Sequence, residues 1–325
     1  MEPAAEDRNA IESWLASAGF ELRDRRPLPG DVSPRRYERL TSTSGDTAIL
    51  ALYPAELREA CGRFARSTRI LASAAIPVPR ILAADCGRGW MLLQDLGELT
   101  VADLRDRAWS ELTPYFENAA LLAARVAALP VEPVRDLNPP LDRALMAREL
   151  EQTWRMFLEP RRLLPPGAAS SPLRTALDEL CTALAAEPAV PCHRDFMARN
   201  LVPRSPGTVA VLDHQDLRLG PPGYDLASLL NDTLFPPPAL EERLVGAALP
   251  GAAGRLSYHR AAAQRTLKAV GTYAAFASRG SGRHLPLIAP TLRRFLDHLG
   301  QVPEGARLAP GLELAWREAL PPGET

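Results

Sequence analysis

A short β-hairpin pattern inside a mainly helical sequence is the feature that most constrains how this chain can fold. Beyond Gly97 the apolar residues recur mostly at helical spacing. The exception is a pair of β-type runs over residues 201–203 and 208–212. A hairpin returns the residue before its first strand and the residue after its second strand to the same end of the ribbon. Asn200 and Asp213 occupy those two places, so we expect their side chains to lie close together.

The segment immediately before this hairpin contains the groups that phosphoryl transfer requires. Residues 193–200 read His-Arg-Asp-Phe-Met-Ala-Arg-Asn. In phosphoryl transfer a carboxylate accepts the proton of the attacking hydroxyl, while an amide oxygen and a second carboxylate bind magnesium beside the nucleotide phosphates. We therefore predict Asp195 as the catalytic base, and Asn200 and Asp213 as Mg²⁺ ligands. The spacing H-R-D-x-x-x-x-N, followed by a strand that ends in aspartate, is typical of protein kinases. The alternative is that Asp195 and Asn200 are ordinary turn residues.

Two further polar residues are predicted to support this loop. We expect His193 to orient the turn through hydrogen bonds, while the neighbouring carboxylate accepts the proton. Asp225 stands at the start of an apolar helical run. A carboxylate at that place caps the helix or braces the catalytic loop with its charge. Both roles are structural.

The first 97 residues predict a small antiparallel sheet with a helix packed on it. Helices are expected over residues 5–18 and 56–74, a hairpin over 37–40 and 47–52, and two more strands over 80–84 and 90–94. The loop before the hairpin contains Ser33, Arg35 and Arg36. Its small residues and guanidinium groups are suited to lie over ATP phosphates. A solvated arginine pair is the alternative.

The rest of the sequence predicts a helix-rich region around the catalytic hairpin. Helices are expected over residues 109–129, 141–157, 172–186, 224–234, 255–278 and 288–299. The tail after Pro303 is expected to be partly loose. The predicted fold class is therefore α+β, with a small antiparallel-sheet region followed by a helix-rich region that contains one catalytic β-hairpin.

Charge and hydropathy exclude several classes of function. Lysine and arginine together number 38 and aspartate and glutamate 39, so no overall field attracts nucleic acid or an anionic membrane. The chain has no run of about 20 apolar residues, and its first residues lack the pattern of a secretory signal. We expect a cytoplasmic protein with no nucleic-acid partner, no membrane contact and no obligate protein partner.

Cysteine and lysine are rare in this chain, and their positions lead to two further predictions. The four cysteines form no CxxC pair, so we expect buried small apolar residues rather than zinc ligands or a dense disulfide framework. Lys268 is the only lysine. It is expected on a solvated face of the last long helical run, with contact to a phosphate or sugar as the alternative.

Several segments together resemble the aminoglycoside phosphotransferase-like kinases. The similarity covers most of the chain. Within that family it is closest to the bacterial anomeric kinases that phosphorylate N-acetylmuramate and N-acetylglucosamine in cell-wall recycling. The segments that carry it are residues 31–37, 78–85, 91–97, 193–201, 212–216, 220–226 and 265–271.

The resemblance implies a two-lobed, protein-kinase-like fold. Residues 1–97 correspond to a nucleotide-binding lobe that ends in a hinge, and residues 98–325 to a helical lobe with the catalytic loop and the sugar site. The implied enzyme is a sugar kinase that uses ATP and Mg²⁺ to phosphorylate an amino sugar at its anomeric C1 hydroxyl, giving a sugar 1-phosphate. The implied hinge residues that bind the nucleotide are Gln94, Asp95 and Leu96. The candidate substrate residues are Glu149, Gln215 and Asp216.

One departure from the kinase pattern leaves two rival functions to consider. Residues 49–52, Ile-Leu-Ala-Leu, lack the strand lysine with which kinases bind the α- and β-phosphates, so we expect Arg35 or Arg36 to supply that charge. An aminoglycoside or choline-type phosphotransferase is the rival enzyme, and it requires an acidic pocket for a cationic acceptor. A catalytically silent, kinase-like nucleotide-binding protein is the other rival. The joint presence of a base and metal ligands argues against it.

Overall fold

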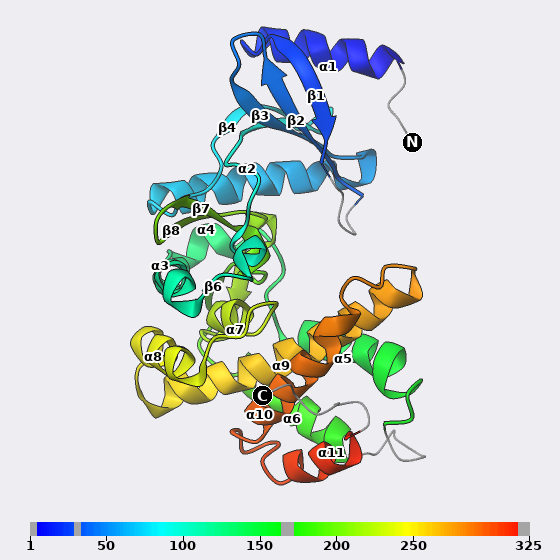
Figure 1. Ribbon diagram of the computed structural model, residues 1–325, viewed down its shortest axis with the longest axis vertical. Helices are drawn as coiled ribbons and strands as arrows, with labels where there is room; N and C mark the ends of the chain where they lie inside the picture. Colours follow the sequence, from blue (N-terminus) through cyan, green and yellow to red (C-terminus); the bar gives the residue numbers. More distant parts are fainter. Residues whose placement is uncertain (1–4, 29–33, 164–171, 318–325) are drawn as a thin grey trace. The chain divides into compact units, whose positions relative to one another are not determined.

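The chain forms a five-stranded antiparallel sheet with a helix on each face, and a second, mainly helical body. The computed structural model describes residues 5–28, 34–163 and 172–317 (Figure 1). By internal contacts the chain divides into two compact units. Unit 1 contains Met1–Glu98 and Ala210–Asp216, and unit 2 contains Leu99–Val209 and Leu217–Thr325.

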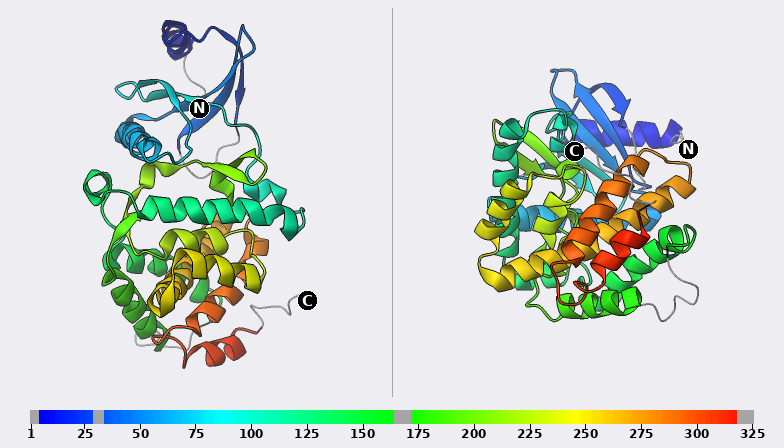
Figure 2. Two further views of the ribbon diagram at one scale, coloured as in Figure 1. Left: turned by 90° about the vertical axis from the view of Figure 1, so that its left-hand side faces the viewer. Right: turned by 60° about the horizontal axis from the view of Figure 1, so that its bottom comes forward.

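Unit 1 is built on a sheet with the strand order β1-β2-β3-β5-β4. Its elements are α1 (Ala5–Ser17), β1 (Leu22–Pro27), β2 (Arg36–Ser42), β3 (Thr47–Leu52), α2 (Arg58–Ser73), β4 (Ile81–Asp85) and β5 (Trp90–Gln94). Alternate residues of β3 enter two apolar clusters, Leu50 with α1 and Ala51 with α2, because side chains alternate across a strand. The sheet therefore lies between the two helices (Figures 1 and 2).

Two features of unit 1 differ from the expectations. The sequence pattern does not predict β1, because the run Leu-Arg-Asp-Arg-Arg-Pro is charged at most positions; β1 forms as an edge strand that pairs only with β2. Cys61 and Cys86 form a disulfide between α2 and the turn after β4, so the expectation that the cysteines are simply buried small apolar residues is wrong for this pair. Cys181 and Cys192 are buried free thiols, as expected.

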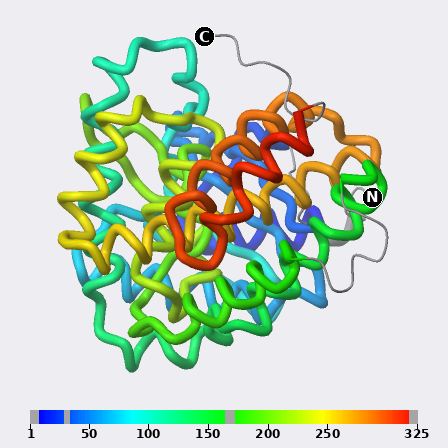
Figure 3. The backbone as a smooth tube through the Cα atoms, turned by 90° about the horizontal axis from the view of Figure 1, so that it is seen from below, coloured from blue at the N-terminus to red at the C-terminus, as the bar shows by residue number. Residues whose placement is uncertain are grey.

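Unit 2 is organised around one long helix, α9 (Gly251–Ser278). The other helices are α3 (Trp109–Ala127), α4 (Val131–Arg135), α5 (Arg143–Thr153), α6 (Pro172–Ala185), α7 (Tyr224–Leu230), α8 (Pro238–Ala248), α10 (Ile288–Leu299) and α11 (Ala309–Ala315). Helix α10 runs alongside α9 (Figure 3). Helix α5 also packs closely on α9 at Gly271, where an added Cβ atom would lie 2.5 Å from the Thr153 Cα atom. None of the described helices is long and apolar enough to cross a membrane.

Two short antiparallel ladders complete the fold. The predicted catalytic hairpin forms from β7 (Leu201–Ser205) and β8 (Thr208–Val211). The sequence does not predict the second ladder, between β6 (Val190–Cys192) and β9 (Arg218–Gly220), because strands of three residues are too short to show an alternating pattern.

The ends of several helices also differ from the expectations. The helix expected over residues 224–234 ends at Leu230, and α4 and α8 were not expected. The tail after Pro303 was expected to be partly loose, and this expectation is wrong for the residues up to 317. Helix α11 forms, and Trp316 is fully buried and donates its indole N–H to the carbonyl oxygen of Leu163 at 2.9 Å. One buried aromatic ring thus fixes this segment to unit 2.

Candidate active site

The predicted catalytic loop follows β6 in unit 2 and has a strained backbone. Arg194 has φ = +76°, a left-handed conformation that costs a non-glycine residue about 1–2 kcal/mol. The two carboxylate oxygens of Asp225 accept the backbone N–H groups of His193 (2.6 Å) and Arg194 (2.8 Å). The Ser228 hydroxyl donates to the Arg194 carbonyl oxygen at 3.1 Å. Helix α7 therefore fixes the backbone from which Asp195 projects.

Three cations lie around Asp195. Its Oδ1 atom is 3.4 Å from the Arg265 guanidinium, and 23% of its side chain is exposed. Burial opposes ionisation, but Lys268, Arg265 and Arg194 together hold the pKa of Asp195 below its usual value. Asp195 is therefore ionised throughout the neutral range. Such a weak base is suited to orient a hydroxyl group and to accept its proton late, as the bond to phosphorus forms.

Glu149 of α5 connects this loop to α9. Its Oε1 atom accepts hydrogen bonds from Arg194 (2.7 Å) and Lys268 (3.0 Å), and its Oε2 atom accepts one from Gln264 (3.3 Å). Burial favours the neutral acid, but Lys268 and Arg194 hold the pKa of Glu149 below its usual value. The Lys268 side chain is only 13% exposed. The expectation that Lys268 lies on a solvated face is therefore wrong, because it shares one side of α9 with Gln264 and Arg265 and pairs with Glu149 there.

Each of the two predicted metal ligands has a side-chain oxygen that could bind a metal. Asn200 lies in unit 2 and Asp213 lies in unit 1. In unit 2, the Asn200 amide N–H donates to the Asp195 carbonyl oxygen at 2.8 Å, which fixes the side chain with its amide oxygen turned away from that carbonyl. In unit 1, Asp213 has φ = +57°, and its Oδ1 atom accepts hydrogen bonds from Arg35 (3.2 Å) and Gln215 (2.9 Å). Its side chain is 37% exposed.

These donor atoms fit magnesium. Mg²⁺ prefers amide and carboxylate oxygens, and it usually takes one or two protein ligands while substrate phosphates and water supply the rest. The described residues contain no group of three or more His, Cys, Asp or Glu side chains that is placed to hold a metal.

The segment that carries Asp213 is attached to α2 by a histidine that the sequence analysis did not single out. The His214 ring forms a hydrogen bond with the Ser67 hydroxyl at 2.8 Å and lies 4.2 Å from the Phe64 ring. The backbone N–H of Val211 donates to the carbonyl oxygen of Pro77 at 2.8 Å. These contacts fix the position of Asp213 within unit 1.

The predicted nucleotide and substrate residues differ in how their side chains are engaged. Asp95 accepts two hydrogen bonds from Arg39, at 2.7 and 3.0 Å, and one from the Gly97 N–H at 2.9 Å, so its carboxylate is occupied within unit 1. The Gln94 amide oxygen accepts a hydrogen bond from Arg80 at 3.3 Å. Of the others, Leu96 and Asp216 are half-buried, Arg36 is exposed, Gln215 is buried, and Ser33 lies outside the described residues.

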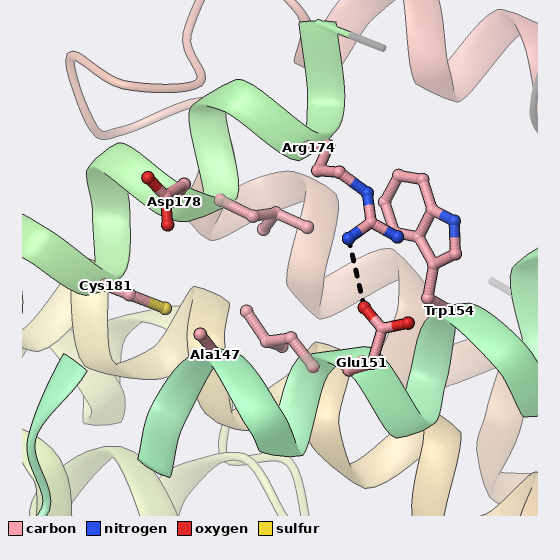
Figure 4. Close-up of a pocket in the computed structure, with 8 residues that line it drawn as sticks. Ala147, Glu151, Trp154, Arg174, Asp178 and Cys181 are labelled. Atoms are coloured by element: carbon pink, nitrogen blue, oxygen red, sulfur yellow. Dashed lines mark hydrogen bonds and ion pairs between the residues drawn. The ribbon is translucent and has the colours of Figure 1, made fainter. Parts of the chain in front are cut away.

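The other side of α5 is closed by α6 and has no room for a sugar. A cavity of about 70 Å³ lies there, far below the 300–1,000 Å³ or so of typical ligand sites. Figure 4 shows Arg174 of α6 over the Trp154 ring, 4.2 Å from its centroid, and bonded to Glu151 at 3.0 Å. This cavity is therefore too small to be the sugar site.

Comparisons with known proteins show which family the chain is similar to. Residues 24–263 match the sequence profile described as "Phosphotransferase enzyme family". The chain is 31% identical to an N-acetylmuramate/N-acetylglucosamine kinase of Pseudomonas aeruginosa, over 87% of this chain and 86% of that protein. It is 30% identical to a protein of the same name from Neisseria meningitidis, over 92% of each.

The fold has solved counterparts as well. The ADP-bound aminoglycoside phosphotransferase APH(2'')-Ib superposes with a TM-score of 0.62 at 13% identity, over 90% of this chain and 98% of that one. This likeness confirms the predicted α+β, kinase-like fold class. The profile match covers most of the chain and includes the loop of Asp195 and Asn200 together with the Asp213 segment. The chain therefore belongs to the phosphotransferase enzyme family.

Proposed function

We propose that this enzyme transfers the γ-phosphoryl group of ATP to the C1 hydroxyl of N-acetylmuramate or N-acetylglucosamine, as a cytoplasmic step of cell-wall recycling. The observation that carries the proposal is Asp195, a partly exposed carboxylate that nearby cations keep ionised, at the base position of the H-R-D-x-x-x-x-N pattern. The relatives of that name match almost the whole chain, which supports the choice of acceptor.

In the proposed reaction Asp195 orients the acceptor. Its carboxylate accepts a hydrogen bond from the sugar hydroxyl, whose oxygen attacks the γ-phosphorus. The new sugar O–P bond forms as the bond from the γ-phosphorus to the bridging oxygen of ADP breaks, and the hydroxyl proton passes to Asp195. Lys268, Arg265 and Arg194 keep Asp195 ionised until that transfer. Asn200 and Asp213 would hold Mg²⁺, which supplies charge neutralisation at the ATP phosphates.

We further propose that Arg35 replaces the missing strand lysine. Burial disfavours its cation, but Tyr37 and Asp213 hold the pKa of Arg35 above its usual value. A permanently charged guanidinium beside a metal-ligand carboxylate is suited to bind phosphate oxygens. In this proposal residues 1–97 form the nucleotide-binding lobe, with Gln94 to Leu96 at the hinge.

The charges near Asp195 argue against a cationic acceptor. An aminoglycoside or choline requires carboxylates that are free to pair with it. Arg194, Lys268 and Arg265 instead surround the base, and Glu149 already pairs with two of them. This arrangement favours a neutral or anionic sugar.

A phosphotransfer screen tests the proposed activity. The wild-type enzyme with ATP and Mg²⁺ is offered N-acetylmuramate, N-acetylglucosamine, glucosamine, an aminoglycoside and choline, and phosphorus NMR locates the phosphate. We expect a sugar 1-phosphate. Phosphate on the aminoglycoside or on choline, or ATP binding without any transfer, would contradict the proposal.

Replacing the base tests its assigned role. Asp195→Asn should lower kcat by about 10²- to 10⁴-fold, because a positioned base contributes that much. Its affinity for ATP should stay close to that of the wild type. Asp178→Asn is the matched control, since Asp178 is an exposed residue of α6 that pairs with Arg143. Full turnover by Asp195→Asn would refute the assignment.

The metal assignment has its own test. Asp213→Ala should weaken nucleotide binding in the presence of Mg²⁺ and make it insensitive to added Mg²⁺, because a carboxylate ligand is lost. Calorimetry with ADP, with and without Mg²⁺, measures both effects. Unchanged Mg²⁺-dependent affinity would exclude Asp213 as a ligand.

A further inference from the structure

The only lysine of the chain lies inside the catalytic cluster. The Lys268 Nζ atom is 3.0 Å from the Glu149 Oε1 atom, and 13% of the Lys268 side chain is exposed. An ammonium group has three N–H donors, and this ion pair uses one of them. Lys268 is therefore mostly desolvated, yet its side chain remains accessible to a ligand.

Cations outnumber carboxylates at this place. Arg194 and Lys268 share one oxygen of Glu149. Arg265 pairs with Asp195. Around Lys268, three positive groups including Lys268 itself thus face two carboxylates, and low polarity strengthens their mutual repulsion; a further carboxylate, Asp232, acts on Arg265.

The nearby Asp225 carboxylate does not offset the positive charge around Lys268. Asp225 uses both its oxygens to accept the backbone N–H groups of the loop. Burial lowers the pKa of Lys268; the Glu149 carboxylate opposes this most, and the Arg265 and Arg194 cations act in the same direction as burial, so the pKa stays below its usual value. An additional anion beside Lys268 would stabilise its charged form.

We propose that Lys268, with Arg265, binds a carboxylate of the acceptor sugar and makes the enzyme prefer N-acetylmuramate to N-acetylglucosamine. This inference rests on the proposed function, because both acceptors come from it. N-acetylmuramate carries a lactyl ether that ends in a carboxylate, whereas N-acetylglucosamine has a neutral hydroxyl in that place. Ammonium and guanidinium groups form strong, charge-assisted hydrogen bonds with carboxylates.

The spacing on α9 suits this assignment. Arg265 contacts the base, and Lys268 lies three residues further along the helix, a rise of about 4.5 Å. The lactyl ether is attached to the oxygen at C3, two ring positions from C1. With its C1 hydroxyl at Asp195, such a sugar has its carboxylate close enough to reach Lys268, because the Lys268 cation itself acts on Asp195.

The ratio of kcat/KM for N-acetylmuramate to kcat/KM for N-acetylglucosamine tests the proposal. A substitution that affects the base, nucleotide binding or the fold changes kcat/KM by the same factor for both acceptors. Such an effect therefore cancels in this ratio. Lys268→Met should lower the ratio about 10- to 100-fold, the range expected for one partly desolvated charged contact. Lys268→Arg should restore most of it. Arg260→Met, which removes a cation of the same helix that pairs with Glu304, should leave the ratio unchanged.

An acceptor analogue gives a test that needs no variant and therefore decides the case where Lys268→Met fails to fold. The wild-type enzyme should use the lactyl carboxamide of N-acetylmuramate about as poorly as N-acetylglucosamine. Equal use of carboxylate and carboxamide would overturn the proposal. An equal fall in both rate constants on substitution of Lys268 would also overturn it, since a role toward phosphate or in the fold does not distinguish the acceptors. Both results leave the proposed kinase function intact, whereas a wild-type enzyme that phosphorylates neither sugar refutes both.

Discussion

Replacing Asp225 by alanine tests whether α7 fixes the catalytic loop through two backbone hydrogen bonds. The substitution leaves the N–H groups of His193 and Arg194 without the acceptors that now lie at 2.6 and 2.8 Å. Each buried donor left unpaired costs about 1–3 kcal/mol, so the two together cost about 2–6 kcal/mol. Burial raises the pKa of Asp225, which shows that its charge is costly to bury, and alanine removes that cost. We therefore expect a loss of about 2–4 kcal/mol in the free energy of unfolding.

The same substitution should impair catalysis beyond its effect on stability. The left-handed conformation of Arg194 costs about 1–2 kcal/mol and is held by the contacts that Asp225 makes. Without them the backbone can relax, and Asp195, the next residue, moves with it. Misplacement of a reacting group by 1 Å can cost about 10²-fold. We expect kcat at saturating substrates to fall at least about tenfold under conditions where the variant is fully folded.

Urea unfolding and steady-state kinetics measure the two effects. Asp142→Ala is the matched control, since this exposed carboxylate also accepts a backbone N–H, from Leu145 at 2.8 Å, but as the N-cap of α5. Its loss should cost about 1 kcal/mol and leave kcat unchanged. Asp225→Asn, which keeps one acceptor oxygen, should lie between alanine and the wild type. If Asp225→Ala lost no more stability than Asp142→Ala and kept wild-type kcat, the reasoning about the loop would be refuted.

Two further predictions concern pH and stability. The pKa of Asp195 is lowered, so the stabilisation from its charge is complete above the usual carboxylate pKa of about 4 and is lost only as the pH falls through its lower folded-state pKa. Arg265→Met removes one of the cations that lower the pKa of Asp195, so that pKa should rise and the acid limb of the kcat–pH profile should move to higher pH. An acid limb that does not move would show that Arg265 does not act on the base. Arg294→Met leaves the buried Glu241 carboxylate without its cation and should cost about 3–5 kcal/mol in urea unfolding. Arg243→Met breaks an exposed ion pair and should cost less than about 1 kcal/mol, and equal losses in the two variants would contradict this.

The catalytic hairpin could be predicted from the sequence because its signals are local. Turn residues between two short β-type runs, and polar residues directly before and after them, lie within 21 consecutive positions, 193–213. The structure forms the hairpin at these positions as β7 and β8.

The residues around Asp195 could not be predicted in the same way, because they come from distant parts of the chain. Gln264 and Glu149 are 115 residues apart in sequence and 3.3 Å apart in space. No local rule relates α5 to α9, and a single lysine on a helix is usually solvated. The interpretation of Lys268 as a surface residue followed that rule and failed because a carboxylate of another helix faces it.

A signal for this cluster is nevertheless present in α9 itself. The segment around Gln264 consists largely of alanine and other small or apolar residues that are buried on several sides of the helix, so it lacks the polar face of a surface helix. Polar side chains in such a helix are costly unless they have partners. Gln264, Arg265 and Lys268, at spacings that place them on one side, therefore indicate a buried polar network rather than solvent. Because that network includes the base, the discrimination between acceptors is expected to depend on α9 more than on the loop that carries the motif.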